Sequence, residues 1–273
     1  MITVVNNRDQ RLEPKQLRSR SGSMGLVLDD SWRFDRFRDA IRDLPADIDR
    51  PTLLSETFRL YADRRLSIYY APFDRVNTRA RLVLVGVTPG WTQMEIAYRT
   101  ARQGLLEGHE REAILANVKR TARFAGSMRV NLVTMLDDLG LPATLGVSMS
   151  SLFDERDDLL HSTSAIRYPV FVNGRNYTGH QPRPLDVSIL TAFVEEQLSS
   201  ELASVDSALI VPLGDAVERC LDFLVRRHQL PRERCLFGFP HPSGANGHRA
   251  RHFAERRDEL RRTLREWFAS ASA

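Results

Sequence analysis

The feature that most constrains the fold is an apolar run that ends abruptly in a turn containing glycine and proline. The run is LVLV at residues 82–85, and it leads directly into GVTPGW at residues 86–91. Residues of this kind favour a buried strand, whereas Gly and Pro stop the strand and turn the backbone. The pattern predicts a helix at about 92–106 directly after the turn. Strand, tight turn and helix in this order are typical of a parallel sheet covered by helices.

The alternation continues along the rest of the chain. Further helices are predicted at about 109–124, 129–139, 187–204, 215–228 and 249–268. Strands are predicted near 208–212 and 234–239, and residues 165–172 are expected to form a second core strand or an extended run. The predicted fold class is therefore α/β, with three αβα layers around a central, mainly parallel sheet of four strands.

The N-terminal part is predicted to extend this domain. Residues 1–29 are polar and are expected to be a flexible lead-in. Ser31 can cap a helix that ends near Leu44, and a second helix is expected at about 54–64. These helices would form a cover at about 30–65 on a single domain spanning 30–273.

Composition excludes several classes of protein. No apolar stretch approaches the roughly 20 residues that span a bilayer, and the N-terminus does not resemble a signal peptide, so a cytoplasmic protein is expected. Two cysteines, Cys220 and Cys235, are too few for a disulfide framework or a metal cage. The sequence has neither a Walker loop nor a dinucleotide fingerprint, so no metal, cofactor or nucleotide partner is expected.

The charge of the chain is compatible with nucleic acid as a partner. The net charge is +4, and all but two of the 39 basic residues are arginine. Arginine can form two hydrogen bonds to a phosphate and can stack on bases. A GC-rich genome also encodes arginine throughout its proteins, so composition alone leaves DNA binding open.

A second loop identifies a family resemblance. The sequence HPSGAN at residues 241–246 follows an apolar run, and a strand-like segment at 208–216 ends in Leu-Gly before a helix. With the Gly-x-x-Pro-Gly turn at 86–90, these elements resemble the signature motifs of the uracil-DNA glycosylase superfamily. The resemblance covers about residues 68–268. It implies an enzyme that flips a base out of DNA and hydrolyses its glycosidic bond, leaving an abasic site.

The resemblance implies two catalytic positions. His241 matches the histidine that donates a hydrogen bond to the departing base. Thr88 stands where the family usually has an Asp or Asn that orients water, so it offers a hydroxyl but no charge. Glu95, one helical turn further on, is an alternative acid, although a solvated helix position is its ordinary interpretation. Two cysteines cannot hold the four-cysteine iron–sulfur cluster of some branches.

The resemblance also suggests which residues would contact the base. Gly90 replaces a tyrosine that excludes methylated pyrimidines, and the usual uracil-reading Asn has no clear counterpart. We therefore expect an enlarged or modified pyrimidine as substrate, such as modified cytosine in phage DNA. The expected base-contacting residues are Gly86, Val87, Pro89, Gly90, Trp91, Ser164 and Asn173.

A second set of residues is expected to contact DNA outside the base. The loop 173–184 contains two arginines, a tyrosine and several amides, a mixture that can clamp phosphate and stack on a base. The expected DNA-binding residues are Arg175, Tyr177, Ser243, Gly244, Asn246, His248 and Arg249.

Two alternatives remain open from the sequence. An ordinary repair glycosylase for uracil or other deaminated bases would differ only in its substrate. A protein that binds and senses a base without cutting is favoured by the missing acid at Thr88. The two lysines, Lys15 and Lys119, match no nucleophile motif, so a monofunctional, monomeric enzyme with DNA as its partner is expected.

Overall fold

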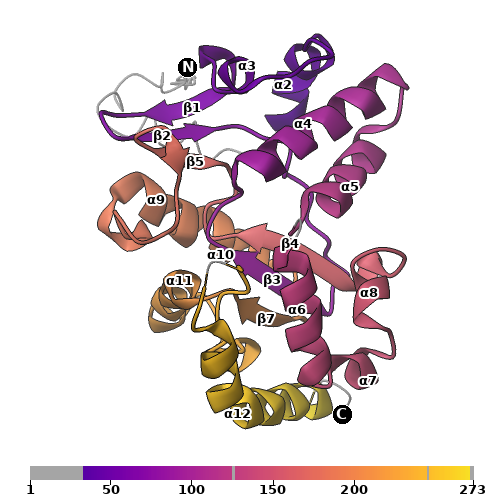
Figure 1. Ribbon diagram of the computed structural model, residues 1–273, viewed down its shortest axis with the longest axis vertical. Coiled ribbons are helices and arrows are strands. Elements are labelled where there is room, and N and C mark those ends of the chain that lie inside the picture. The colour runs from indigo at the N-terminus through magenta and orange to yellow at the C-terminus, as the bar shows by residue number, and fades with distance from the viewer. Residues whose placement is uncertain (1–32, 125–126, 245, 271–273) are drawn as a thin grey trace, which may run out of the picture.

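The computed structural model describes residues 33–124, 127–244 and 246–270 (Figure 1). Its α-helices are α2 Arg33–Arg42, α3 Arg50–Leu53, α4 Trp91–Leu106, α5 Arg111–Ala122, α6 Ser127–Asp138, α7 Leu141–Leu145, α8 Met149–Leu152, α9 Ser188–Ala192, α10 Ser199–Ala203, α11 Asp215–Arg226 and α12 Arg249–Ser270. Its strands are β1 Arg59–Ala62, β2 Leu66–Tyr69, β3 Leu82–Gly86, β4 Leu160–Ser164, β5 Val170–Val172, β6 Arg175–Asn176 and β7 Leu209–Pro212. The predicted α/β class is confirmed, and no helix in these ranges is long and apolar enough to cross a membrane.

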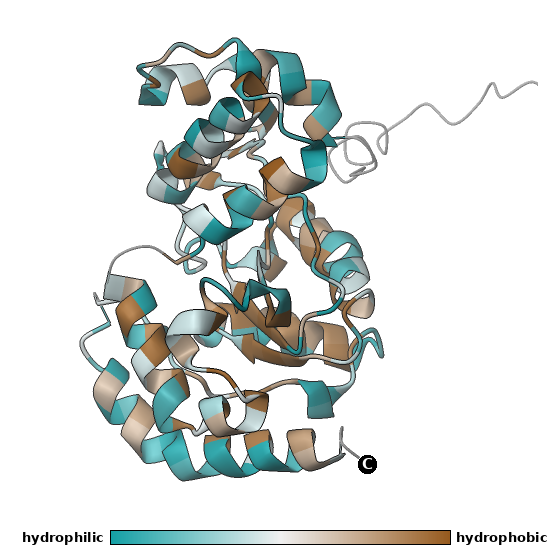
Figure 2. Cartoon of the chain, turned by 90° about the vertical axis from the view of Figure 1, so that its right-hand side faces the viewer, coloured by the Kyte–Doolittle hydropathy of each residue, from teal (hydrophilic) through white to brown (hydrophobic). Residues whose placement is uncertain are grey.

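A parallel sheet at the centre of the molecule carries the site. Its strand order is β4-β3-β7, with β3 hydrogen-bonded to both neighbours. Alternate residues of β3 enter two different cores: Val83 and Val85 pack with α4 and α11, whereas Leu82 and Leu84 pack with α6 and α12. The parallel sheet therefore has a core on each face, and Figure 2 shows the apolar strands enclosed by helices with polar outer faces.

The predicted fourth parallel strand at 234–239 is wrong. This segment pairs with β7 through a single parallel bridge between Cys235 and Ile210, and the amide of Leu236 donates to the carbonyl of Ile210 at 2.8 Å. A short 3-10 turn, Arg232–Arg234, precedes it, and Gly238 has φ +89°, a conformation that ends an extended run. The central sheet therefore has three strands in the described part of the chain.

The second core strand also differs from the prediction. In the central sheet it is β4 at Leu160–Ser164, whereas within 165–172 only Val170–Val172 is a strand, β5 of the antiparallel sheet. The sequence of β4, LHSTS, is polar although four of its five residues are buried. Buried partners explain this, because His161 is hydrogen-bonded to Glu201 at 2.7 Å. A pattern based on hydropathy cannot recognise such a strand.

An antiparallel sheet with the order β1-β2-β5-β6 covers the N-terminal side. The helix predicted at 54–64 is absent: these residues form a 3-10 turn, Glu56–Phe58, and β1, and the short helix α3 ends before them at Leu53. The carboxylate of Asp63 accepts hydrogen bonds from the amides of Arg65 and Leu66, both at 2.7 Å, and so fixes the β1–β2 turn. The predicted lead-in and the Ser31 cap lie outside the described residues, but α2 packs on this region, with Phe37 stacked on Tyr70.

The remaining helix predictions are confirmed. The helices at 92–106, 109–124, 129–139, 215–228 and 249–268 correspond to α4, α5, α6, α11 and α12. The long helix predicted at 187–204 is α9 and α10 joined by a π-helical segment, Phe193–Leu198. The strands predicted at 82–85 and 208–212 are β3 and β7.

Candidate functional site

The carboxyl ends of β4, β3 and β7 form one edge of the parallel sheet. The chain leaves β3 to build β4 on one side and later builds β7 on the other. The connections that leave β3 and β7 at their carboxyl ends therefore run in opposite directions across the sheet. A place where neighbouring connections run in opposite directions is called a topological switch point, and open α/β sheets bind their ligands there. The first predicted motif lies directly at this point.

The first motif is held rigidly by side chains from two directions. Gly90 is the N-cap of α4, and its amide donates to Oε1 of Gln93 at 3.1 Å. The amide of Trp91 donates to Oδ1 of Asn176 at 3.1 Å. The amide of Gly90 is therefore already engaged, although the sequence suggested it as a base contact. Trp91 is half-buried against the core, with the guanidinium of Arg50 5.2 Å from its ring centre.

Thr88 has a structural role that the sequence did not reveal. Its hydroxyl donates to the carbonyl of Tyr168 at 2.8 Å and accepts from the amide of Val170 at 3.2 Å. These two bonds tie the first motif to the start of β5. The single hydroxyl proton is directed to Tyr168, so only the second lone pair of the hydroxyl is left for a water, and the expectation that Thr88 positions a water stays a prediction.

Two glycines show that the separate motifs reach the same edge. A Cβ on Gly179 would lie 3.0 Å from Val87 in the first motif and 2.8 Å from Ala216 at the start of α11. A Cβ on Gly214, directly after β7, would lie 2.8 Å from Cβ of His241. Loop 173–184 therefore passes between the first motif and the β7 end, and the His241 loop packs on that end. The expected convergence of the two motifs agrees with these contacts.

The immediate surroundings of His241 define its hydrogen-bonding role. The imidazole is half-buried, and Nδ1 accepts a hydrogen bond from the amide of Ser243 at 3.2 Å. Burial lowers the pKa of His241, and nearby His180 lowers it further. The ring is therefore neutral at pH 7 with its proton on Nε2, which makes Nε2 a hydrogen-bond donor.

The loop around His241 is fixed by amide and guanidinium groups. Asn131 of α6 donates to the carbonyl of Pro242 at 2.8 Å, and Arg249 donates to the carbonyl of Ser243 at 2.7 Å. Asn246 donates to the carbonyl of His241 at 3.2 Å. The side chains of Arg249 and Asn246, both expected to contact DNA, instead donate hydrogen bonds to backbone carbonyls of this loop.

The other predicted DNA contacts in this region are more open. Gly244 and His248 are exposed, and the ring of His248 stacks on His252 with centres 5.8 Å apart. Ser243 is half-buried. Gly244 and His248 therefore remain exposed next to His241.

Loop 173–184 differs from the expectation in two places. Tyr177 is buried, and its hydroxyl donates to the carbonyl of Pro182 at 2.6 Å, so it cannot stack on a base. Asn173 lies in the exposed turn between β5 and β6, where φ is +50°, and does not line the pocket described below. Arg175 is exposed on β6. The residues of this loop that reach the sheet edge are Asn176, Gly179 and His180, and none of them belonged to the expected set.

A small pocket at the carboxyl end of β4 is lined by residues that the sequence did not suggest. Its volume is about 30 Å³, which is room for about two waters and too little for a nucleobase. Pro89 and Ser164, both expected to contact the base, line it. Other polar side chains that line the pocket are those of Gln93, Lys119, Arg123, Thr163 and Arg167.

A buried charge network supports the floor of this pocket. Glu201 accepts from His161 at 2.7 Å and from Nη2 of Arg167 at 2.7 Å. Burial alone raises the pKa of Glu201, but Arg167 and His161 outweigh it and hold that pKa well below its usual range. Burial lowers the pKa of His161, so this ring is neutral and donates through Nε2.

Lys119 lies at the end of α5 within the same region. Its Nζ donates to the carbonyl of Ser162 at 2.9 Å, and burial lowers its pKa to about 8. Glu95, the alternative acid, pairs instead with Arg99, which also binds the carbonyl of Ile48. Glu95 therefore fastens the N-terminal cover. Among the described residues no group of three or more His, Cys, Asp or Glu side chains is arranged to hold a metal.

The fold and the site together define an α/β protein with loops converging at a switch point of a parallel sheet. The chain is 43% identical over 236 residues to the uncharacterized protein YoxB of Bacillus subtilis strain 168. The alignment covers 85% of this chain and 92% of YoxB. The chain therefore belongs to the same family as YoxB. No family model matches it, and no solved structure matches it.

Proposed function

We propose that the protein is a monofunctional DNA glycosylase of the uracil-DNA glycosylase superfamily. The observation that carries the proposal is the state of His241, whose Nδ1 is occupied by the Ser243 amide so that Nε2 is a donor. A neutral donor suits a reaction in which negative charge develops on a carbonyl oxygen of the departing base. Contacts of Gly214 and Gly179 support a shared edge for His241 and the first motif.

The chemistry required of the protein is limited to binding and stabilisation. Water attacks C1′ of the flipped nucleotide as the glycosidic bond breaks, and the bonding electron pair leaves with the base, which takes up the proton that the water loses. His241 stabilises that charge, while the sugar cation is stabilised by DNA phosphates because Thr88 carries no charge. We propose a modified pyrimidine as substrate, since Gly90 has no side chain and only the amide of Asn176 lies 3.4 Å from its Cβ position. A DNA substrate is consistent with the cytoplasmic location predicted from the sequence.

A second candidate function rests on Thr88. Its hydroxyl is engaged with Tyr168 and Val170, so the first motif lacks both the acid and a free hydroxyl. A protein whose first motif lacks an acid can flip and bind a base without cleaving the glycosidic bond. We propose base sensing as the alternative if no abasic sites are formed.

The test is abasic-site formation on DNA containing uracil, hypoxanthine, 5-hydroxymethylcytosine or glycosylated cytosine. We expect release of a modified cytosine, and a loss of about 100-fold or more in the single-turnover rate for His241→Ala. The matched control is His109→Ala, an exposed histidine between α4 and α5 that belongs to neither expected set, and it should retain the rate within about threefold. Release of uracil alone would support the repair enzyme, and DNA binding without release would support the sensor.

A further inference from the structure

Three buried cationic side chains line the pocket at the end of β4, and the acids that attract Lys119, namely Glu201 and Asp74, are hydrogen-bonded to other side chains. Lys119, Arg123 and Arg167 are each at most 8% exposed, and none of the residues that line the pocket is acidic. Glu201 pairs with Arg167, and Asp157 pairs with Arg123. Lys119 has no ion-pair partner within the described ranges. A buried cation without a counter-ion is costly, so a bound anion would stabilise this arrangement.

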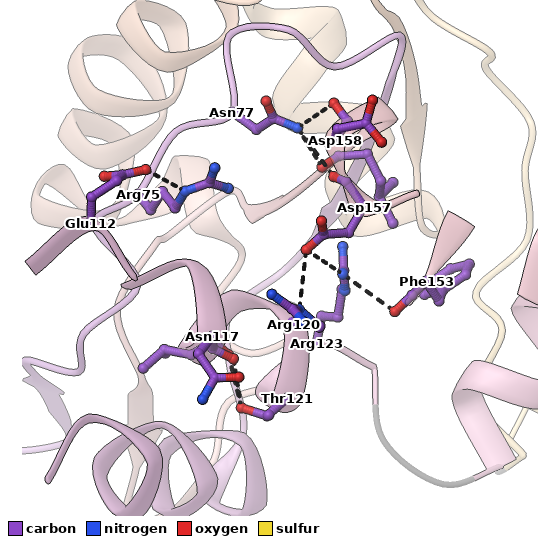
Figure 3. Close-up of polar contacts among 12 residues, drawn as sticks. Arg75, Asn77, Glu112, Asn117, Arg120, Thr121, Arg123, Phe153, Asp157 and Asp158 are labelled. Atoms are coloured by element: carbon purple, nitrogen blue, oxygen red, sulfur yellow. Dashed lines mark hydrogen bonds and ion pairs between the residues drawn. The ribbon is translucent and has the colours of Figure 1, made fainter. Parts of the chain in front are cut away.

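Hydrogen-bonding groups in the pocket are also left without partners. Within the part of the chain that the structure describes, Nε of Arg123 and Oγ1 of Thr163 are buried and make no hydrogen bond. The orientation of the Arg123 guanidinium is fixed, because Nη2 donates to the carboxylate of Asp157 at 3.2 Å and to the carbonyl of Phe153 at 3.3 Å (Figure 3). Lys119 has three N–H donors, of which one reaches Ser162. Buried polar groups normally have partners, so these vacant donors point to a ligand that accepts hydrogen bonds.

We propose that this pocket binds one small oxyanion, the size of a phosphate or a carboxylate. Lys119 and Nε of Arg123 would donate to its oxygens, and the Thr163 hydroxyl would donate a further hydrogen bond. The volume of about 30 Å³ matches such a group, which would replace about two waters. No covalent step is involved.

The place of the pocket beside the first motif suggests where the oxyanion comes from. Pro89 and Gln93 line it, and Gln93 also holds the Gly90 amide, so the pocket adjoins the loop proposed to hold the base. His241 stands at the other end of the same edge, about two strand spacings or roughly 10 Å away. The oxyanion is either free or carried by the flipped base, and the second source rests on the proposed glycosylase function.

The first experiment measures binding of inorganic phosphate to the whole protein by calorimetry at constant ionic strength. We expect one saturable site and a loss of affinity of at least about tenfold in Lys119→Met. Thr163→Val should weaken binding about threefold to tenfold without destabilising the fold, because it removes a buried hydroxyl that has no partner in the empty pocket. The matched control Arg120→Gln, on the same helix and exposed, should change the affinity less than about twofold.

The opposite pattern would overturn the inference. No saturable binding, or equal affinity in wild type, Lys119→Met and Thr163→Val, would exclude an oxyanion site here. Thr163→Val serves as the decisive variant if Lys119→Met does not fold.

The second experiment distinguishes the two sources. Oligonucleotides containing 5-carboxycytosine or unmodified cytosine compete with phosphate for the wild-type protein. Preferential competition by the carboxylated DNA, lost in Lys119→Met, would assign the oxyanion to the base, and equal competition would assign it to a free ion. Phosphate binding in a protein that releases no base from any DNA would leave the oxyanion site intact and reject only the glycosylase.

Discussion

The two ends of the sheet edge are built by different physical means. At the β7 end, His241 is positioned by hydrogen bonds that involve backbone groups of one short loop, with loop amides, Asn131 and Arg249 as donors, and by the close approach of Gly214. At the β4 end, the pocket is held by charged side chains that come from separate segments, with Glu201 at the centre. The β7 end can therefore be altered locally, whereas the β4 end depends on a buried charge balance that also stabilises the fold.

The largest expected effect concerns Glu201. Glu201→Gln removes the charge that faces Arg167 and His161, all three of which are buried. We expect a loss of about 3–5 kcal/mol in the free energy of unfolding, because a buried arginine is left uncompensated. Urea denaturation measures it, with the exposed pair of Glu255 as control: Glu255→Gln should change stability by less than about 1 kcal/mol. Equal free energies of unfolding in the two variants would show that the Glu201 carboxylate does not stabilise the buried charge of Arg167.

The next effect is the pH dependence caused by Lys119. Its pKa is lowered from 10.5 to about 8 in the folded state, so folding is penalised below pH 8 and the penalty disappears as pH rises from 8 to 10.5. Cys220 has the opposite sign, since burial raises its thiol pKa from 9.0 to about 12 and stability is lost over that interval.

The variant Lys119→Met separates these two contributions. The stability of wild type relative to Lys119→Met should rise by about 3 kcal/mol between pH 8 and 10.5, the linkage energy of a shift of this size. Urea unfolding of both proteins at several pH values measures the difference. A difference that does not vary with pH would mean that Lys119 keeps an ordinary pKa.

A smaller effect is expected at Gly214, on the β7 side. Gly214→Ala places a Cβ 2.8 Å from His241 at a backbone φ of +89°. We expect a cost of about 1–3 kcal/mol and displacement of His241, measured as lost stability and reduced base release. The control is Gly146→Ala, where φ is +69° but nothing lies within 4 Å. It should show a cost of about 1–2 kcal/mol from the backbone alone and no change in base release. Equal rates of base release in the two variants would mean that the position of His241 does not affect the reaction.

The comparison also explains what the sequence could predict. The His241 loop and the turn at Gly90 are contiguous motifs, so both can be found in the sequence, and the strand before the Gly90 turn was predicted correctly. The β4 end was missed because Lys119 and Glu201 are 82 positions apart and each is an ordinary helix residue by pattern. Strand β4 was missed for the same reason, since its polar residues are buried only because partners from distant segments satisfy them.

Burial also determined which of the predicted contact residues are accessible. Tyr177 was expected to stack on a base because tyrosines in loops often do, yet its hydroxyl finds a carbonyl five residues away and the ring is covered. Whether a polar side chain in a loop faces solvent or the core depends on tertiary contacts that a single sequence does not contain. Periodic helices such as α4 and α11 were placed correctly because their apolar faces are repeated every turn.

The smallest effect is expected at Thr88, between the two ends. Thr88→Val leaves the carbonyl of Tyr168 and the amide of Val170 without the hydroxyl that links them, so stability should fall by about 1–2 kcal/mol. Thr88→Ser retains the hydroxyl and should lie within about 1 kcal/mol of wild type. Base release should change less than about tenfold in either variant, because the hydroxyl holds the backbone and contributes no charge to the reaction. A fall of 100-fold or more in Thr88→Val with unchanged stability would assign the hydroxyl to the attacking water and contradict its structural role.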